Sequence, residues 1–337
     1  MNIEQRKKDH VDLCVSGRVD YDFDAGFERY HFRHNALPEV DLGEISTECT
    51  FLGRTFAFPL FISSMTGGYA QAGAVNAIIA SFCEKQKLPF GVGSQRVMLE
   101  KPETTASFSI VREVAPHAFI AANIGGCQLI SSTLESDLEN IISCIKADAL
   151  IIHLNPLQEL MQPEGDVNFR GIKDGIKKAV ELVNIPVIIK ETGAGISKEV
   201  ALRLIDCGVH SIDIAGAGGT SWAKVENERA GVKASTFNNW GLPTAFILEE
   251  YGAEICDKVQ VISSGGIRTS FDIAKSLCLG ASIGAAAQPV IQAIVDEGEE
   301  GLETWYNNLV SDMKKIMCLL GISRIEQFGP HYLIKRA

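Results

Sequence analysis

Short apolar segments recur along the chain, and each of them ends in glycine or in a small or polar residue. Runs that are this short and almost continuously apolar are typical of strands buried on both faces of a parallel sheet. We predict eight such strands, over residues 58–63, 89–93, 118–123, 149–155, 186–190, 211–215, 259–263 and 281–286.

Segments with helical spacing lie between these strands. Residues 73–87 place Ala74, Ile78 and Phe82 on one face, and 174–183, 197–207 and 270–279 show similar periodicity. Strands and helices that alternate eight times, at intervals of roughly 30 residues, predict an α/β fold, the (β/α)₈ TIM barrel. A doubly wound sheet is the alternative, but its first strand is expected to run into a GxGxxG turn, which this segment lacks.

Both ends of the chain lie outside this repeat. We predict a β-hairpin over 44–56, turning at Leu52-Gly53-Arg54, that caps the floor of the barrel. Apolar residues recur with helical spacing from Leu302 to Leu320 and predict an amphipathic closing helix. We therefore expect a single domain over 1–337, consisting of an N-terminal extension with the hairpin (1–57), the barrel (58–301) and a C-terminal helix and tail (302–337).

One segment of the predicted barrel is unusually long. Residues 221–244, between the sixth strand and its helix, are polar and mixed in character. Long βα-loops on a barrel tend to be functional, so we expect this one to form a lid over the site.

Composition and charge restrict the class of protein. The 337 residues are 46% apolar and carry a net charge of -11, which argues against nucleic acid or an anionic membrane surface as partner. No apolar run approaches the 18 residues of a membrane span, and the first ten residues lack the apolar region of a signal peptide. Nine cysteines without a CxxC pair indicate free thiols and a cytoplasmic location.

Active sites of such barrels lie at the C-terminal ends of the strands, so the residues that follow each strand are candidates. Ser264-Gly265-Gly266-Ile267-Arg268 follows the seventh strand and precedes a helix. Loops seven and eight of barrels frequently bind phosphate through backbone N–H groups at a helix N-terminus, and glycine lets the backbone approach closely. We predict a phosphate site there.

Other strand ends suggest what the phosphate belongs to. Lys190 ends the fifth strand and suits a Schiff-base nucleophile, a phosphate contact or a contact to an electron-rich ring edge; the residues leave these three roles open. Short hydrogen-bonding side chains, which suit a flat heterocycle with polar edges, end four other strands: Thr66, Ser94, Asn123 and Thr220. Together with the phosphate site they favour flavin mononucleotide (FMN) or a similar phosphorylated cofactor.

A second anion site is indicated by two basic segments. The run RKKDH at 6–10 concentrates positive charge, and Arg96 offers a planar guanidinium that fits phosphate oxygens. The fourth strand ends in four polar side chains, His153, Asn155, Gln158 and Glu159. A single carboxylate such as Glu159 is enough to hold Mg²⁺ when diphosphate oxygens and waters complete its coordination.

With these residues in hand, the chain resembles the type 2, flavin-dependent isopentenyl-diphosphate isomerases from Arg6 to about Met317. The order and spacing of eight segments carry the resemblance: RKKDH at 6–10, SSMTGG at 63–68, GVGSQR at 91–96, ANIG at 122–125, HLNPLQE at 153–159, KETGAGIS at 190–197, GAGGTSWAKVENER at 216–229 and SSGGIR at 263–268. The chain departs from the family pattern at Thr192, at Ala194 and in the plain Ala285-Ala286-Ala287-Gln288 of strand eight.

The resemblance implies the conversion of isopentenyl to dimethylallyl diphosphate in isoprenoid biosynthesis, with reduced FMN as acid and base, NADPH as reductant and Mg²⁺ on the diphosphate. It also implies a homo-oligomer, a tetramer or octamer. The implied FMN contacts are Ser64, Met65, Thr66, Ser94, Asn123, Lys190, Thr220, Gly266, Ile267, Arg268, Ala287 and Gln288. The implied substrate contacts are Arg6, Lys7, His10, Ser94, Gln95, Arg96, His153, Asn155 and Gln158, with Glu159 on the metal.

Protonating an unactivated alkene is the hard step of such a reaction, because an alkene is a very weak base. Our hypothesis is that Gln158 positions the substrate or relays a proton, with His153 as the alternative acid. Two other functions stay open: a 2-hydroxy-acid oxidase or dehydrogenase on the same flavin barrel, and a non-catalytic barrel that binds a phosphorylated metabolite.

Overall fold

Eight parallel strands close into a barrel in the computed structural model, which describes residues 3–232 and 235–336, and the side chains of all of these except 3–8 and 70. The strands are β4 (Leu60–Ile62), β5 (Phe90–Gly91), β6 (Ile120–Gly125), β7 (Ala149–Leu154), β8 (Val187–Glu191), β9 (Ser211–Asp213), β10 (Gln260–Ser263) and β11 (Ile283–Ala286). Their order around the barrel follows the sequence, and β11 closes the ring against β4. The eight predicted strands and the (β/α)₈ barrel are confirmed.

The register of the strands decides which polar residues become neighbours. Gly125 of β6 is paired with His153 of β7, His153 with Lys190 of β8, and Lys190 with Asp213 of β9. These four residues therefore form one row across the C-terminal end of the barrel. Below that row the strands are almost entirely buried, because helices cover their outer face and apolar side chains fill the interior.

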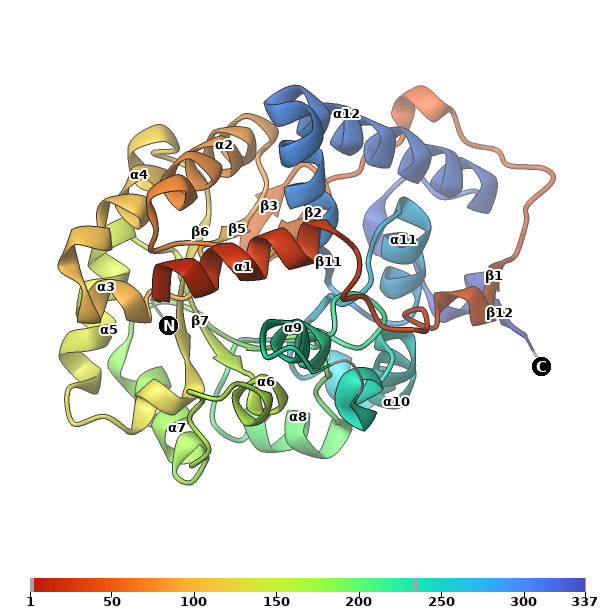
Figure 1. Ribbon diagram of the computed structural model, residues 1–337. Helices are drawn as coiled ribbons and strands as arrows, with labels where there is room; N and C mark the ends of the chain where they lie inside the picture. Colours follow the sequence, from red (N-terminus) through yellow and green to blue (C-terminus); the bar gives the residue numbers. More distant parts are fainter. Residues whose placement is uncertain (1–2, 233–234, 337) are drawn as a thin grey trace.

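A ring of helices surrounds the barrel (Figure 1). They are α2 (Ala70–Gln86), α4 (Ala106–Val114), α5 (Leu134–Ile145), α7 (Ile172–Leu182), α8 (Lys198–Ile205), α10 (Thr244–Cys256), α11 (Ser270–Cys278) and α12 (Gln288–Leu320). The side chain of Ser197 caps α8 by accepting the N–H of Val200. Thr269 and Asp272 form a capping box at the start of α11.

The C-terminal helix is present, but it begins earlier than expected. α12 starts directly after β11 and runs to Leu320, with one non-helical residue, Gly298, in its interior. The last helix of the barrel and the closing helix therefore follow each other across a kink, and the sequence pattern from Leu302 onward marks only the second part.

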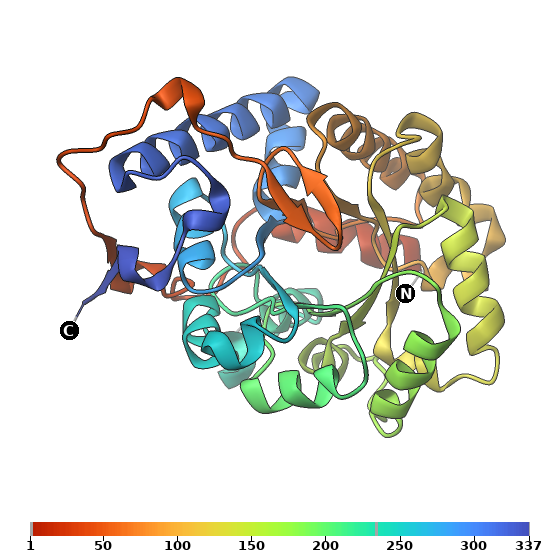
Figure 2. The ribbon, with the colours of Figure 1, turned by 180° about the vertical axis from the view of Figure 1, so that it is seen from behind.

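The predicted hairpin consists of β2 (Cys49–Phe51) and β3 (Arg54–Phe56). Leu52 and Gly53 both have positive φ, 46° and 73°, as a two-residue hairpin turn requires. Phe51 packs edge-on against Phe61 of β4, and Figure 2 shows the hairpin across the end of the barrel opposite α1. The hairpin thus covers the floor.

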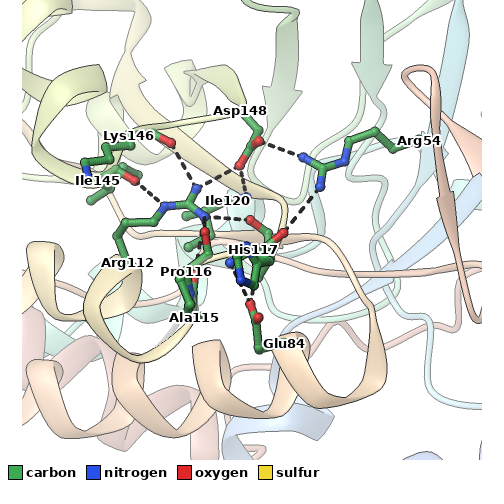
Figure 3. A network of polar contacts seen from close by, with 11 residues as sticks. Arg54, Glu84, Arg112, Ala115, Pro116, His117, Ile120, Ile145, Lys146 and Asp148 are labelled. Carbon is green, nitrogen blue, oxygen red and sulfur yellow. Dashed lines mark hydrogen bonds and ion pairs between the residues drawn. The ribbon is translucent and has the colours of Figure 1, made fainter.

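A polar network joins this hairpin to the barrel (Figure 3). The Arg112 guanidinium on α4 is 2.8 Å from the Asp148 carboxylate, which also accepts the N–H of Ile120 and pairs with Arg54 of β3 at 2.7 Å. Arg112 donates in addition to five backbone carbonyls, those of Ala115, Pro116, Ala118, Ile145 and Lys146. One side chain therefore ties α4 to the loops that lead into β6 and β7.

Four further helices stand at the other end of the barrel: α1 (Ile3–Val15), α3 (Arg96–Glu100), α6 (Pro156–Met161) and α9 (Trp222–Arg229). α1 crosses the barrel mouth in Figure 1. β1 (Tyr30–Phe32) pairs with β12 (Leu333–Lys335), so the N-terminal extension is joined to the C-terminal tail. Single 3₁₀ turns occupy 27–29, 42–44, 102–104, 126–130, 236–239, 325–327 and 330–332.

Two findings bear on the class of protein. Within 3–232 and 235–336, every helix is too short or too polar to cross a bilayer. All nine cysteines are free thiols.

Candidate active site

A cavity of about 180 Å³ opens at the C-terminal ends of the strands, beneath α1. Nine of the twelve residues expected to bind FMN line it: Ser64, Met65, Lys190, Thr220, Gly266, Ile267, Arg268, Ala287 and Gln288. His10 of α1 lines it as well, together with Val11 and Cys14. The N-terminal helix therefore forms part of the cavity wall within the same chain.

The loops after β9 and β10 make a close-packed cradle of backbone. Gly266 has a φ of 75°, and a Cβ built on it would lie 2.7 Å from the carbonyl oxygen of Gly218. Only glycine fits there, because both the conformation and the contact exclude a side chain. The Arg268 guanidinium lies beside the cradle and donates to the Gly218 carbonyl at 3.1 Å. Backbone N–H groups, a guanidinium and the nearby start of α11 make an environment that suits a phosphate.

Two hydroxyl groups of the cavity wall are unsatisfied. The Oγ atoms of Ser63 and Ser64, directly after β4, are buried, and the described residues offer neither of them a hydrogen bond. A buried hydroxyl without a partner costs about 1–3 kcal/mol, so such groups indicate a missing ligand. The phosphate cradle at one side and these hydroxyls at the other fit a phosphorylated, ring-bearing cofactor such as FMN.

Lys190 reaches into the cavity from β8 and forms a buried ion pair. Its Nζ lies 3.1 Å from the Asp213 carboxylate on β9, which also accepts the hydroxyl of Ser264, the residue directly after β10. The partner is Asp213 and not the adjacent Glu191, because parallel pairing puts Lys190 and Asp213 at the same height. The Glu191 carboxylate instead accepts the four N–H groups of residues 192–195. Three roles were left open for Lys190. Its ion pair favours the two in which its charge meets the ligand, the phosphate contact and the ring-edge contact, over the Schiff-base nucleophile.

Three of the twelve expected FMN residues lie outside the cavity lining. Asn123 is buried, and its amide binds the carbonyl of Val92 and the Nδ1 of His153. Thr66 is buried beyond β4, and Ser94, half-buried, follows β5. Their expected contacts with FMN stay predictions.

A second group of polar side chains surrounds Glu226 on α9. Its carboxylate is fully buried and lies 3.0 Å from the Nε2 of His10, while the amide nitrogen of Gln158 donates to it at 3.1 Å. Arg229 also contacts it. Burial alone would raise the pKa of Glu226, but the hydrogen bond and charge of His10, with the amide of Gln158 and the charge of Arg229, hold that pKa below its usual range.

The end of β7 connects to this group. Asn155 precedes α6 and donates to the Gln158 side-chain oxygen at 3.0 Å and to Glu159 at 3.0 Å. The amide of Gln158 is thereby fixed between Asn155 and Glu226. The structure thus brings together His10, Asn155 and Gln158, three of the residues expected to bind substrate, and it adds Glu226, which we did not predict.

Glu226 could have been found from the sequence, because a helix start is recognisable within the segment 221–244 that we interpreted as a polar loop. Ser221 is an N-cap, and its side chain accepts the N–H of Lys224 at 3.3 Å to start α9. Residues 222–229 are therefore helical, and one face of that helix points its polar groups at the barrel mouth.

Each oxygen of the Glu159 carboxylate already accepts one hydrogen bond. The donors are Asn155 and, at 2.7 Å, the N–H of Asp166. The described residues hold no group of three or more histidine, cysteine or acidic side chains that could bind a metal ion. Mg²⁺ fits here only if substrate oxygens and water supply the other ligands.

The remaining expected substrate residues fall into three groups. Arg96 is half-exposed and pairs with Glu100 and Asp166 at 2.7 and 3.2 Å. Gln95 departs from expectation: it is fully buried, its oxygen accepts the N–H of Asn123 and its nitrogen donates to the carbonyl of Ile141, so neither end remains for a ligand. The side chains of Arg6 and Lys7 lie outside those described.

Asp20 links the N-terminal segment to the phosphate cradle. Its carboxylate is 2.9 Å from Arg268 and accepts the amide of Gln288 at 2.8 Å. Gln288 also donates to the carbonyl of Cys14 at the end of α1. The residues expected to hold the FMN phosphate therefore also hold the helix that covers the mouth.

Comparison with known proteins bears on the fold and the family. The sequence profile of the family described as FMN-dependent dehydrogenase matches residues 22–109 and 155–335. The recombinant flavin-binding domain of baker's yeast flavocytochrome b2 has a similar structure, with a TM-score of 0.71 at 16% identity over 98% of this chain and 90% of that one. A mandelate oxidase variant gives 0.69 at 17% identity, with 100% of both chains covered. At these identities the structural likeness shows the fold alone.

Sequence relatives are more specific. An isopentenyl-diphosphate delta-isomerase of Nostoc sp. is 43% identical over 330 residues, which covers 96% of this chain and 93% of the relative. One from Chlorobaculum parvum is 45% identical over 332 residues, with 92% of each covered. On a barrel shared with the FMN-dependent dehydrogenases, this chain therefore belongs to the family of the isopentenyl-diphosphate delta-isomerases.

Proposed function

We propose that the protein converts isopentenyl diphosphate into dimethylallyl diphosphate, with FMN in the cavity at the barrel mouth. The observation that carries this proposal is the position of the buried Glu226–Gln158–His10 group, beside a cavity built for a phosphorylated cofactor. The names of the relatives support the same reaction.

The cofactor would be held at both ends. Gly266, Arg268 and Gln288 would bind its phosphate, and Lys190 would meet the polar edge of its ring while Ser64 donates a hydrogen bond. When bound and reduced, FMN supplies an electron-rich ring beside which positive charge can develop on the substrate.

The chain's own residues would position the alkene and handle the proton. Gln158 presents a fixed amide, because Asn155 holds its oxygen and Glu226 its nitrogen. The lowered pKa of Glu226 keeps it ionised at neutral pH, so that its charge would hold the imidazole of His10 and the amide of Gln158 in place beside the substrate. His153, held by Asn123, is the alternative acid.

The diphosphate would lie at the side of the mouth formed by α3 and α6. Arg96 would face its oxygens, with Arg6, Lys7, His153 and Asn155 close by and Glu159 on a shared Mg²⁺. We propose further that NADPH reduces the FMN, and that the protein works in the cytoplasm as a homo-oligomer, a tetramer or octamer.

The test is direct. The purified protein should be yellow or become so with FMN, bleach with dithionite, and isomerise isopentenyl diphosphate only when bleached and supplied with Mg²⁺. A preparation that cannot be reconstituted with FMN would contradict the proposal. Bleaching by a 2-hydroxy acid, without isomerisation, would favour the oxidase alternative instead.

A further inference from the structure

A second cavity, of about 520 Å³, lies behind the end of β7, on the outer side of the barrel wall. It is enclosed by residues 126–127, by the end of β7, by residues 169–173 and by the facing sides of α7 and α8. Its volume falls in the range of small-molecule sites. Of its lining residues, His153 and Asn155 also belong to the proposed active site, and the proposed reaction uses none of the others.

The walls of this cavity are apolar. Six side chains form most of them: Leu154, Phe169, Ile172, Ile176, Val200 and Leu204. Leu154 points outward from β7, where it would touch a Cβ built on Gly126. An apolar chain would therefore be removed from water inside the cavity, which is the main source of affinity for such groups.

Three cationic side chains complete the lining of the cavity, and the lining contains no acidic residue. Arg170, Lys173 and Arg203 are exposed residues that border the cavity, and none of them is in an ion pair with any residue in the part of the chain that the structure describes. Arg96 and Arg229, by contrast, are each paired with two carboxylates. Three unpaired cations around one cavity of an acidic protein provide a site complementary to an anion.

We propose that this cavity binds an amphipathic anion, an apolar chain that ends in a phosphate or diphosphate. The apolar walls take the chain and the three cations take the head group. The choice of a prenyl diphosphate as this anion rests on the proposed function, because the reactions that consume a five-carbon allylic diphosphate lengthen its chain. The occupant would touch residues 153–156, which include Asn155, whose side chain binds Gln158.

Calorimetric titration of the FMN-loaded protein with geranyl diphosphate tests this, with isopentenyl diphosphate and Mg²⁺ present in excess to fill the active site. We expect saturable binding that is at least about tenfold weaker in the double variant Arg170→Ser/Arg203→Ser, and likewise in Val200→Trp, which fills the cavity. The matched control is Arg33→Ser/Lys178→Ser, which removes two exposed cations away from the cavity and should bind as the parent does.

Separate titrations with geraniol and with inorganic diphosphate test the two halves of the ligand. The proposal is overturned if geranyl diphosphate does not bind, if either fragment binds as tightly as the whole, or if the double variant binds like its control. Isomerisation by the same preparations is measured in parallel. None of the substituted residues belongs to the proposed active site. Lack of binding at the second cavity with intact turnover would therefore count against this inference only. Absent turnover in the parent would count against the proposed function only.

Discussion

The buried ion pair of Lys190 and Asp213 shows how one residue sets the charge around another residue of the site. Lys190 stands at a strand end, where sequence reasoning looks for chemistry, and we could predict its place. Asp213 lies on the next strand and could not be predicted as its partner, because the pairing depends on the register between β8 and β9. The same holds for Glu226 and Asp20, whose contacts join segments far apart in the sequence.

Replacing Asp213 by asparagine should raise the reduction potential of the bound FMN by about 30 mV, a value that corresponds to about 1.4 kcal/mol for two electrons. The change keeps the shape of the side chain but leaves the Lys190 ammonium without its counter-charge, which favours the more negative, reduced flavin. Spectroscopic redox titration measures the shift. An unchanged or lower potential would show that Asp213 does not act on the cofactor through Lys190.

Gln158→Ala should lower turnover with reduced FMN by about 10²-fold or more, within the range of a lost positioned proton-transfer group, while FMN binding is unaffected. The amide bridges Asn155 and Glu226, and alanine breaks that bridge. Single-turnover kinetics on the pre-reduced enzyme measures the effect. Full turnover in this variant would remove Gln158 from the mechanism.

The lowered pKa of Glu226 has a consequence for stability. In the unfolded chain this carboxyl titrates near its ordinary value of 4.5, and in the folded protein it titrates lower, so its contribution to stability is complete above 4.5 and is lost as the pH falls through the folded pKa. We expect the melting temperature of the parent to fall more steeply than that of Glu226→Gln below pH 4.5. Parallel curves for the two proteins would contradict this.

At the scale of elements, the alternation of strands and helices depends on local patterns, and the eight strands and the barrel could be predicted from it. Each βα repeat carries its own apolar run and its own helical face, so the barrel follows from short-range pattern. The segment 221–244 was harder to interpret, because the polar composition of α9 resembles a loop. α12 was expected to be shorter, because the pattern before Gly298 belongs to the eighth repeat.

The polar network that joins Arg112, Asp148 and Arg54 gives a prediction at this scale. Arg112→Ala should lower the free energy of unfolding by about 3 kcal/mol or more, because it leaves Asp148 without its buried partner and five carbonyls without a donor. Urea denaturation followed by circular dichroism measures it, and Arg33→Ala, an exposed arginine, is the control. A loss no larger than that of the control would mean that the hairpin and barrel hold together without Arg112.

At the scale of the whole molecule, an ion pair and hydrogen bonds connect the N-terminal segment to the phosphate cradle. They involve Asp20, Arg268 and Gln288. No local pattern predicts such a connection, since its members come from both ends of the chain. The resemblance implied that Arg6, Lys7 and His10 contact the substrate, and α1, the helix that carries them, crosses the barrel mouth in Figure 1.

Asp20→Asn should therefore loosen α1 without unfolding the barrel. We expect trypsin to cut at the basic run 6–8 several times faster than in the parent, while the remainder of the chain stays resistant. Timed digestion with mass spectrometry measures both rates. Equal cleavage rates would show that Asp20 does not hold the helix in place.

The closure of the ring by β4 and β11 constrains how the protein can be made. During synthesis on the ribosome, β4 emerges early, and its neighbour on one side is the last barrel strand to appear. Until β11 arrives, β4 presents an open edge of backbone N–H and C=O groups to the cell. The nascent chain must therefore shield that edge for most of its translation, so a chaperone that binds exposed strands would act on the first βα units more than on the last.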